Sequence, residues 1–151
     1  MTKLGVIADS HRNKRRLALA LEEMKDCRYI LCLGDHDSDM EDAEGVGDRL
    51  RAVCGNCDPF SSSPCVQYLQ VENVRLMMTH GDAYGVKYSL TRLFLKAKSE
   101  NVRVALYGHT HERRADEQDG VLLLNPGALK DGKYLILEID GDKIDPVFKE
   151  V

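Results

Sequence analysis

The sequence predicts an α/β fold whose strands end in metal-ligating side chains. Short apolar runs rich in β-branched residues alternate with two stretches of helical periodicity. Several of these runs are followed at once by an Asp, an Asn or a His, and all five histidines of the chain lie just after an apolar run. Ligands bind outside the carboxyl ends of the strands in open α/β sheets. We therefore expect one polar site along that edge.

The composition indicates an ordinary globular chain. Its 151 residues are enough to bury one core, and 43% hydrophobic and 30% charged residues are typical values. We expect a single domain over residues 1–151. The net charge of −4 gives no reason to expect nucleic-acid or membrane binding. The apolar run 4–8 is too short for a signal sequence or a membrane span, which predicts a cytoplasmic protein with reduced thiols.

The first unit is a strand, a site and a helix. Residues 3–8 read as a buried strand that delivers Asp9 and His11. Asn13 can cap the following helix, whose apolar positions Leu17, Leu21 and Met24 share one face. The basic first turn, residues 14–16, has the wrong sign for the helix dipole and fits either a solvated surface or a phosphate-attracting rim.

A second strand over residues 29–33 ends in Gly34 and Asp35. The acidic stretch that follows resembles the start of a calcium-binding EF-hand loop. Its sixth position is Met40 instead of Gly and its twelfth is Val46 instead of Glu, so a calcium loop is excluded. We expect residues 37–44 to form a solvated loop and leave the role of His36 open.

A third strand over residues 49–53 leads into Cys54-Gly55-Asn56-Cys57. A structural zinc site would need a second thiol pair at similar spacing, which is absent. A thioredoxin-like motif would open a helix, whereas residues 58–64 have loop composition. A redox or zinc role of this CxxC pair is therefore disfavoured.

The remaining elements follow the same pattern. We expect a hairpin of residues 66–70 and 74–79 that ends at His80, and strands over 102–107, 121–124, 134–139 and 144–148. The chain from Gly85 onward leads into a second helix, whose expected apolar stripe is Leu90, Leu93, Phe94 and Ala97. The strand over 102–107 precedes Gly108-His109-Thr110-His111, where two imidazoles leave one tight turn. The run 121–124 and the closing hairpin are candidates for an exposed edge that pairs in a homo-oligomer.

Seven side chains at strand ends form the candidate site: Asp9, His11, Asp35, Asn56, His80, His109 and His111. Carboxylate, imidazole and amide groups suit Mn²⁺, Fe²⁺, Ni²⁺ or Zn²⁺ and suit Cu(I) or iron–sulfur clusters poorly. Seven ligands exceed the need of one ion, but they can serve two ions if one carboxylate bridges. Two-metal sites recur in the cleavage of phosphate esters.

The motifs resemble a known family. Asp9-Ser10-His11, Gly34-Asp35, Gly55-Asn56-Cys57-Asp58, His80-Gly81, Gly108-His109-Thr110-His111 and Asn125-Pro126-Gly127 occur in the order and approximate spacing of the calcineurin-like metallophosphoesterases. The small, cap-less YfcE-type phosphodiesterases are the most similar form. The resemblance implies a four-layer α-β-β-α sandwich of two mixed sheets flanked by helices.

The resemblance also implies roles for these residues. One divalent ion is held by Asp9, His11, Asp35 and His111, and the other by Asp35, Asn56, His80 and His109, with Asp35 as the bridge. Two ions per chain, with Mn²⁺ favoured, hold a hydroxide that attacks a small phosphodiester, nucleotide-like or otherwise. Asp35, Asn56 and His80 are the expected catalytic residues. Arg12, Cys57 and Asp58 are the expected substrate-binding residues.

Two departures from the family pattern bear on chemistry. Many members have His where this chain has Cys57, and a thiol with a pKa of about 8.5 is a poor acid for the leaving group. We therefore expect activated diesters to react better than alkyl monoesters. The motif His80-Gly81-Asp82 replaces the frequent His-Gly-His without removing an expected ligand. The alternative function is a non-catalytic, metal-binding scaffold, as in the retromer subunit of similar fold, since fold alone does not prove catalysis.

Overall fold

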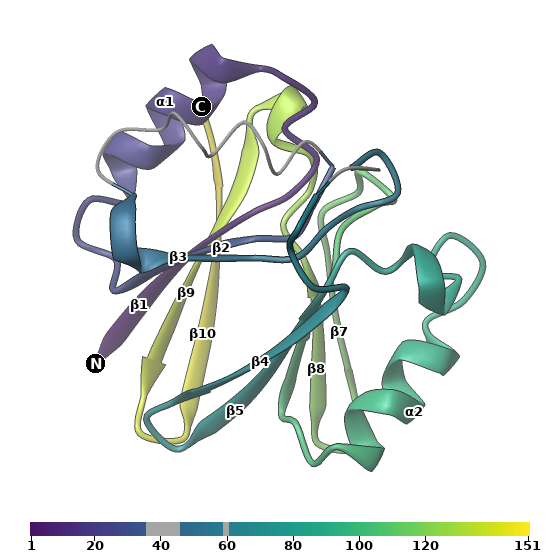
Figure 1. Ribbon diagram of the computed structural model, residues 1–151. Coiled ribbons are helices and arrows are strands. Elements are labelled where there is room, and N and C mark those ends of the chain that lie inside the picture. The colour runs from purple at the N-terminus through teal and green to yellow at the C-terminus, as the bar shows by residue number, and fades with distance from the viewer. Residues whose placement is uncertain (36–45, 59–60) are drawn as a thin grey trace.

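Two five-stranded mixed sheets lie face to face, with one α-helix on the outer face of each (Figure 1). The computed structural model describes residues 1–35, 46–58 and 61–151. Its layer order is helix, sheet, sheet, helix. The predicted four-layer α-β-β-α sandwich is therefore confirmed.

The first sheet has the strand order β10-β9-β1-β2-β3. Its members are β1 (Thr2–Ile7), β2 (Tyr29–Cys32), β3 (Leu50–Ala52), β9 (Lys133–Asp140) and β10 (Lys143–Glu150). Strands β1, β2 and β3 run parallel, whereas β9 is antiparallel to both β1 and β10. The three parallel strands therefore end at the same edge.

The second sheet has the order β4-β5-β6-β8-β7. Its members are β4 (Val66–Val71), β5 (Val74–Thr79), β6 (Val104–Leu106), β7 (Arg114–Gln118) and β8 (Val121–Asn125). Strands β5, β6 and β8 are parallel, and the two outer strands are antiparallel to their neighbours. This sheet thus also presents three parallel strand ends.

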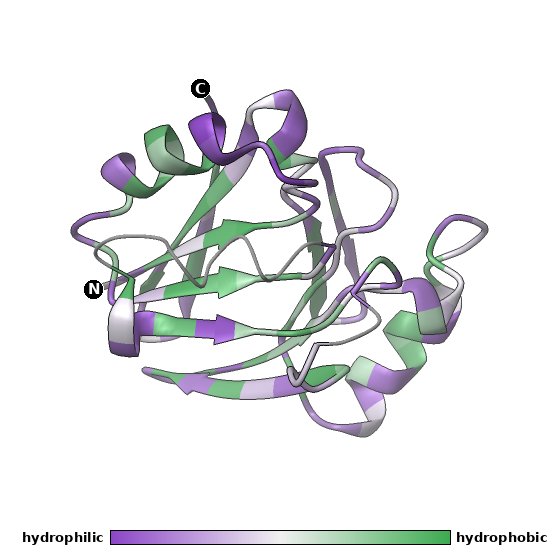
Figure 2. Ribbon diagram, turned by 45° about the horizontal axis from the view of Figure 1, so that its top comes forward, coloured by the Kyte–Doolittle hydropathy of each residue, from purple (hydrophilic) through white to green (hydrophobic). Residues whose placement is uncertain are grey.

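Successive side chains of each strand point to opposite faces of its sheet, so that each sheet packs against a neighbouring layer on both faces. Leu4 and Val6 of β1 face the second sheet in the central core, whereas Ile7 faces α1 (Lys14–Glu23). On the other side, α2 (Thr91–Ser99) covers the second sheet. Both helices carry a hydrophobic and a hydrophilic face, as Figure 2 shows. Burial on both faces keeps the strand ends fixed relative to each other.

Short 3₁₀ turns join these elements, at Gly47–Arg49, Asp82–Tyr84 and Leu129–Asp131. The chain from Gly85, whose φ is 63°, leads into the second helix, which begins at Thr91. Leu93, Phe94 and Ala97 of its predicted apolar stripe are buried. The predicted cap of α1 is confirmed, since the Asn13 side chain accepts a hydrogen bond from the Arg16 amide at 3.2 Å.

Of the two predicted sheet edges, one is wrong and one is confirmed. The run 121–124 is not an edge, because β7 pairs with it along the whole of β8. Strand β7 was not predicted, because its residues are polar and mostly exposed. Of the closing hairpin, β10 is an edge of the first sheet, as expected.

The predictions on His36 and on the acidic residues 37–44 fall outside the described residues. Among the described residues, no helix has the length and apolar character needed to span a membrane.

Candidate metal centre

Strand ends from both sheets place the candidate ligands. Asp9 and His11 follow β1, and Asp35 follows β2. From the second sheet, His80 follows β5 directly. His109 and His111 lie in the loop after β6. These loops meet at one edge of the sandwich, so residues a hundred positions apart come into contact.

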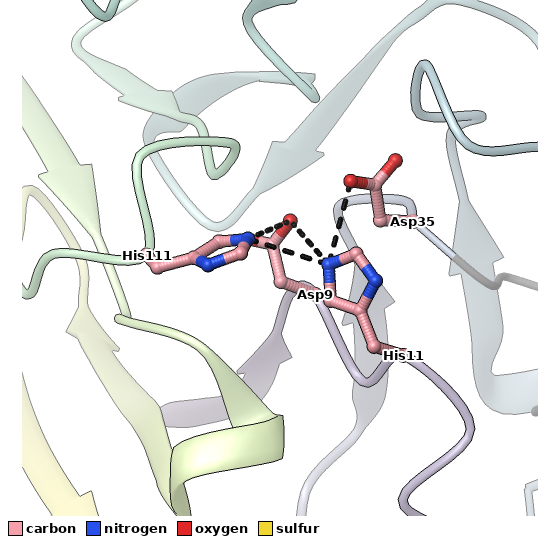
Figure 3. A group of neighbouring side chains, drawn as sticks. All are labelled: Asp9, His11, Asp35 and His111. Atoms are coloured by element: carbon pink, nitrogen blue, oxygen red, sulfur yellow. Dashed lines mark hydrogen bonds and ion pairs between the residues drawn. The ribbon is translucent and has the colours of Figure 1, made fainter.

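Asp9, His11, Asp35 and His111 form the first group of candidate ligands (Figure 3). Their ligand atoms all lie within 4.8 Å of one another. His11 Nε2 is 3.3 Å from His111 Nε2 and 3.5 Å from Asp35 Oδ2. His111 Nε2 is 3.4 Å from Asp9 Oδ1. Two ring nitrogens and two carboxylates therefore converge on one point.

Asp35, His80 and His109 form the second group, again within 4.8 Å. His80 Nε2 lies 3.3 Å from Asp35 Oδ2 and 3.2 Å from His109 Nδ1. The same oxygen of Asp35 thus faces an imidazole of each group. Asp35 occupies the position that a bridging carboxylate needs.

One buried atom in the site has no hydrogen-bond partner. Asp9 is fully buried, and its Oδ1 is unsatisfied although three imidazole nitrogens lie 3.4–3.7 Å away. These separations are long for hydrogen bonds. Two ligands about 2.1 Å from a common ion lie about 3.0–3.4 Å apart at right or tetrahedral angles. The donor set and its spacing therefore fit divalent cations.

The orientation of His80 is fixed by the backbone. Its Nδ1 lies 2.7 Å from the Leu33 carbonyl oxygen, which only accepts hydrogen bonds, so Nδ1 carries the proton. When the ring is neutral, Nε2 presents a lone pair toward Asp35 and His109. Outer contacts of this kind orient metal-binding histidines.

The two carboxylates have opposite pKa shifts. Burial raises the pKa of Asp9 to about 7, with the charge of Asp35 adding to the rise and His80 opposing it. Burial would also raise the pKa of Asp35, but hydrogen bonds from His80 and from the Cys57 amide lower it well below its ordinary value. Asp35 is therefore ionised at neutral pH, and Asp9 is poised to ionise when positive charge arrives.

The pKa values of the histidines are also shifted in opposite directions. Burial lowers the pKa of His109 and His111, so both present neutral rings at pH 7. For His80, the hydrogen bond with Asp35 and the nearby Asp9 charge outweigh burial and raise the pKa. Neutral imidazole is the form that binds metals.

Backbone strain is concentrated at these residues. Five candidate ligands have a positive φ, between 43° and 71°: Asp9, His11, Asp35, His109 and His111. Left-handed conformations are uncommon outside glycine, and such strain clusters at functional sites. The turns aim the side chains inward at an energetic cost.

Close backbone contacts hold Asp35 in place. A Cβ on Gly55 would lie 2.2 Å from Asp35 Oδ1, and a Cβ on Gly34 would lie 2.5 Å from the Gly55 nitrogen. The Cys57 amide donates to Asp35 Oδ1 at 2.9 Å. The loop after β3 therefore lies directly against the shared carboxylate.

The remaining predicted residues lie at the rim. Asn56 is exposed, between Gly55 and Cys57, and its role as a ligand stays a prediction. Cys57 is exposed, and its thiol hydrogen-bonds to Asp35; partial burial and this carboxylate raise its pKa. Asp58 accepts from the Gly55 amide at 2.9 Å and so shapes the loop. Arg12 is exposed beside His11 with a φ of 67°.

Residues outside the ligand set also support the site. Buried Asn125 donates to the Gly108 carbonyl at 3.3 Å and to Thr110 Oγ1 at 2.9 Å, which holds the loop of both late histidines. Its presence in an Asn-Pro-Gly motif is the sequence signal that could have revealed this role. Arg113, close to His111 in the sequence, makes structural contacts: it donates to the Lys149 carbonyl and lies over the Phe148 ring.

Known proteins are similar to this chain in sequence. The profile of the calcineurin-like phosphoesterase superfamily domain matches residues 2–142. A probable metallophosphoesterase of Methanothermobacter thermautotrophicus is 30% identical over 156 residues, covering 94% of this chain and 88% of that protein. A phosphodiesterase of Methanocaldococcus jannaschii is 26% identical over 143 residues, covering 83% and 82%.

Solved structures share the fold. A crystal structure of a single mutant of Vps29 from Entamoeba histolytica superposes with a TM-score of 0.80 at 18% identity, covering 99% of this chain and all of that one. At this identity the likeness shows the fold alone. The profile match over residues 2–142 shows that the chain belongs to the calcineurin-like phosphoesterase superfamily.

Proposed function

We propose that residues 1–151 act as one metal-dependent phosphodiesterase domain that uses two divalent cations, Mn²⁺ foremost, to hydrolyse small phosphate diesters. The observation that carries this proposal is the pair of ligand groups sharing Asp35, together with the unsatisfied Oδ1 of Asp9. The phosphodiesterase among the relatives supports the reaction class. Cytoplasmic location stays a prediction.

Each group has a defined part in this proposal. Asp9, His11, Asp35 and His111 would hold one cation, and Asp35, Asn56, His80 and His109 the other. Bound divalent cations lower the pKa of a shared water toward neutrality and offset the charge that develops on the phosphoryl oxygens.

The protein itself supplies positioning and charge. Asp35 is kept ionised by its hydrogen bonds, and the low pKa of His109 and His111 keeps their rings neutral at pH 7. The exposed Cys57 and Arg12 would contact the substrate at the rim. Since the Cys57 thiol has a raised pKa, it is a weak proton donor, which favours diesters with activated leaving groups.

The test is hydrolysis of bis-p-nitrophenyl phosphate by protein loaded with Mn²⁺, with the metal content measured by elemental analysis. We expect about two ions per chain and metal-dependent turnover. Asp35→Asn should lower turnover at least about 100-fold, since metal ions supply several kcal/mol of transition-state stabilisation. Asp145→Asn, an exposed carboxylate on β10, is the matched control and should retain activity.

A second candidate function is a metal-binding scaffold that works through protein contacts, and the fold match to Vps29 favours it. It predicts bound metal without turnover. If the wild type binds two ions but hydrolyses no member of a phosphoester panel with Mn²⁺, Fe²⁺, Ni²⁺ or Zn²⁺, the scaffold function replaces the enzymatic one.

A further inference from the structure

Two cysteines outside the ligand groups lie next to each other. Cys54 Sγ is 3.7 Å from Cys65 Sγ, although the residues are 11 positions apart. Cys54 is half-buried and Cys65 is exposed, so reagents in solution can reach the pair. None of the five cysteines, all within the described residues, forms a disulfide. The CxxC partner of Cys54 in the sequence, Cys57, instead points its thiol at Asp35.

The backbone around the pair is held in register. Cys54 follows β3, the edge strand of the first sheet, and Cys65 precedes β4, the edge strand of the second. The Cys54 amide donates to the Pro64 carbonyl at 3.0 Å, and the Gln67 side chain donates to the Ala52 carbonyl at 2.9 Å. The two edges are therefore already joined by hydrogen bonds on either side of the sulfurs.

We propose that Cys54 and Cys65 are a site of reversible oxidation, forming a disulfide that links the edges of the two sheets. Disulfide sulfurs are about 2.05 Å apart, so the two atoms must approach by about 1.6 Å. Rotation about the side-chain bonds of an exposed cysteine supplies such a movement.

The oxidant is a low-molecular-weight disulfide such as glutathione disulfide. The thiol of Cys65 attacks one of its sulfurs, forming a mixed disulfide and releasing one glutathione. The thiol of Cys54 then attacks the sulfur of Cys65, forming the protein disulfide and releasing the second glutathione. The two cysteine thiols lose two electrons and two protons in total, and glutathione disulfide gains them.

The crosslink closes the loop that touches the candidate metal centre. Between the two cysteines lie Gly55, which touches Asp35, and Cys57, whose amide donates to Asp35. Oxidation therefore fixes this loop against the shared carboxylate. The covalent site itself is independent of whether the chain hydrolyses phosphate esters.

The experiment treats the full chain with glutathione disulfide and measures intact mass without reduction. We expect a loss of two mass units, reversed by dithiothreitol. A disulfide that closes about a dozen residues should raise Tm by about 8 °C. Cys54→Ser and Cys65→Ser should each abolish both changes.

Peptide mapping identifies the partners. Trypsin and an endoproteinase that cleaves before Asp yield peptides 52–57 and 58–75, so a bond to Cys65 joins the two. Cys57→Ser should still form the joined product, which separates Cys54 from Cys57 as the partner. A bond between Cys54 and Cys57, loss of the crosslink in Cys57→Ser, or only glutathione adducts on the wild type would overturn the proposal.

Discussion

Asp9→Asn should stabilise the metal-free protein, the reverse of the usual effect of altering a buried residue. Asp9 is fully buried, its Oδ1 has no hydrogen-bond partner, and its pKa is raised from 3.8 to about 7. Above pH 7 the folded chain must therefore carry a carboxylate that is more stable in the unfolded chain. The rise of this pKa from 3.8 to about 7 corresponds to a loss of up to about 4 kcal/mol in the free energy of unfolding.

An asparagine side chain fits the same space and can make one more hydrogen bond than the Asp9 carboxylate. Its amide oxygen can accept from the His109 amide, as Asp9 Oδ2 does at 3.1 Å. Its NH₂ group then replaces Oδ1 and donates toward His111 Nε2. Because the folded-state pKa is raised, the wild type loses stability as pH rises through about 7, and Asp9→Asn does not. The difference between them should be small near pH 4 and constant above about pH 8.

Thermal and urea denaturation in EDTA at pH 5 and pH 8 measure this difference. At pH 8 we expect Tm of the variant to exceed that of the wild type by up to about 10 °C. Adding Mn²⁺ at 100 times its Kd should stabilise the wild type by about 2.7 kcal/mol per site and the variant far less. Asp145→Asn is the control and should follow the wild type. A variant less stable than wild type at pH 8 in EDTA would refute the reasoning.

Three further predictions concern the rim and the core. Cys57→His places an imidazole beside the candidate metal centre and should raise the turnover of alkyl monoesters at least about 10-fold relative to that of activated diesters. If steady-state assays gave an unchanged ratio of monoester to diester turnover, position 57 would not be that of a proton donor. Gly34→Ala should lower the free energy of unfolding, measured by urea denaturation, by more than about 3 kcal/mol, because its Cβ would meet the Gly55 nitrogen. Gly120→Ala, also at positive φ but in open space, should lower it by about 1 kcal/mol. Equal losses in the two variants would contradict this prediction. Burial raises the pKa of Cys27 to about 11, so at pH 8 iodoacetamide should label it only after unfolding, as peptide mass spectrometry will show.

The candidate ligands could be picked out from the sequence because the rule that identifies them is local. A buried parallel strand is recognisable from its apolar residues, and the polar residue that follows must emerge at the carboxyl edge. His80 and Asp35 were found in this way. The edge strand β7 escaped detection because its charged residues pack against little, so no apolar period marks it.

Contacts between residues far apart in the sequence, and some backbone conformations, could not be predicted from the sequence for a physical reason. Nothing near Cys54 in the sequence indicates that Cys65 lies beside it, because their contact depends on how the two sheets meet. The left-handed φ of His11 was likewise not predictable, since only a few per cent of non-glycine residues adopt a positive φ. The first residue of the second helix, Thr91, was likewise not readable from the sequence, because two glycines in left-handed conformations, at 81 and 85, set the path of the chain before it.

The centre draws its side chains from both halves of the sandwich: Asp9, His11 and Asp35 belong to one sheet, and His80, His109 and His111 to the other. A cation coordinated by these side chains would crosslink the two sheets. The sheets could then separate only after coordination bonds to the ion had broken. Loaded protein should therefore unfold more slowly, and the amide hydrogens of β1 and β5 should exchange together and later than in the stripped protein. The affinity for metal and the kinetic stability of the fold would then depend on the same side chains.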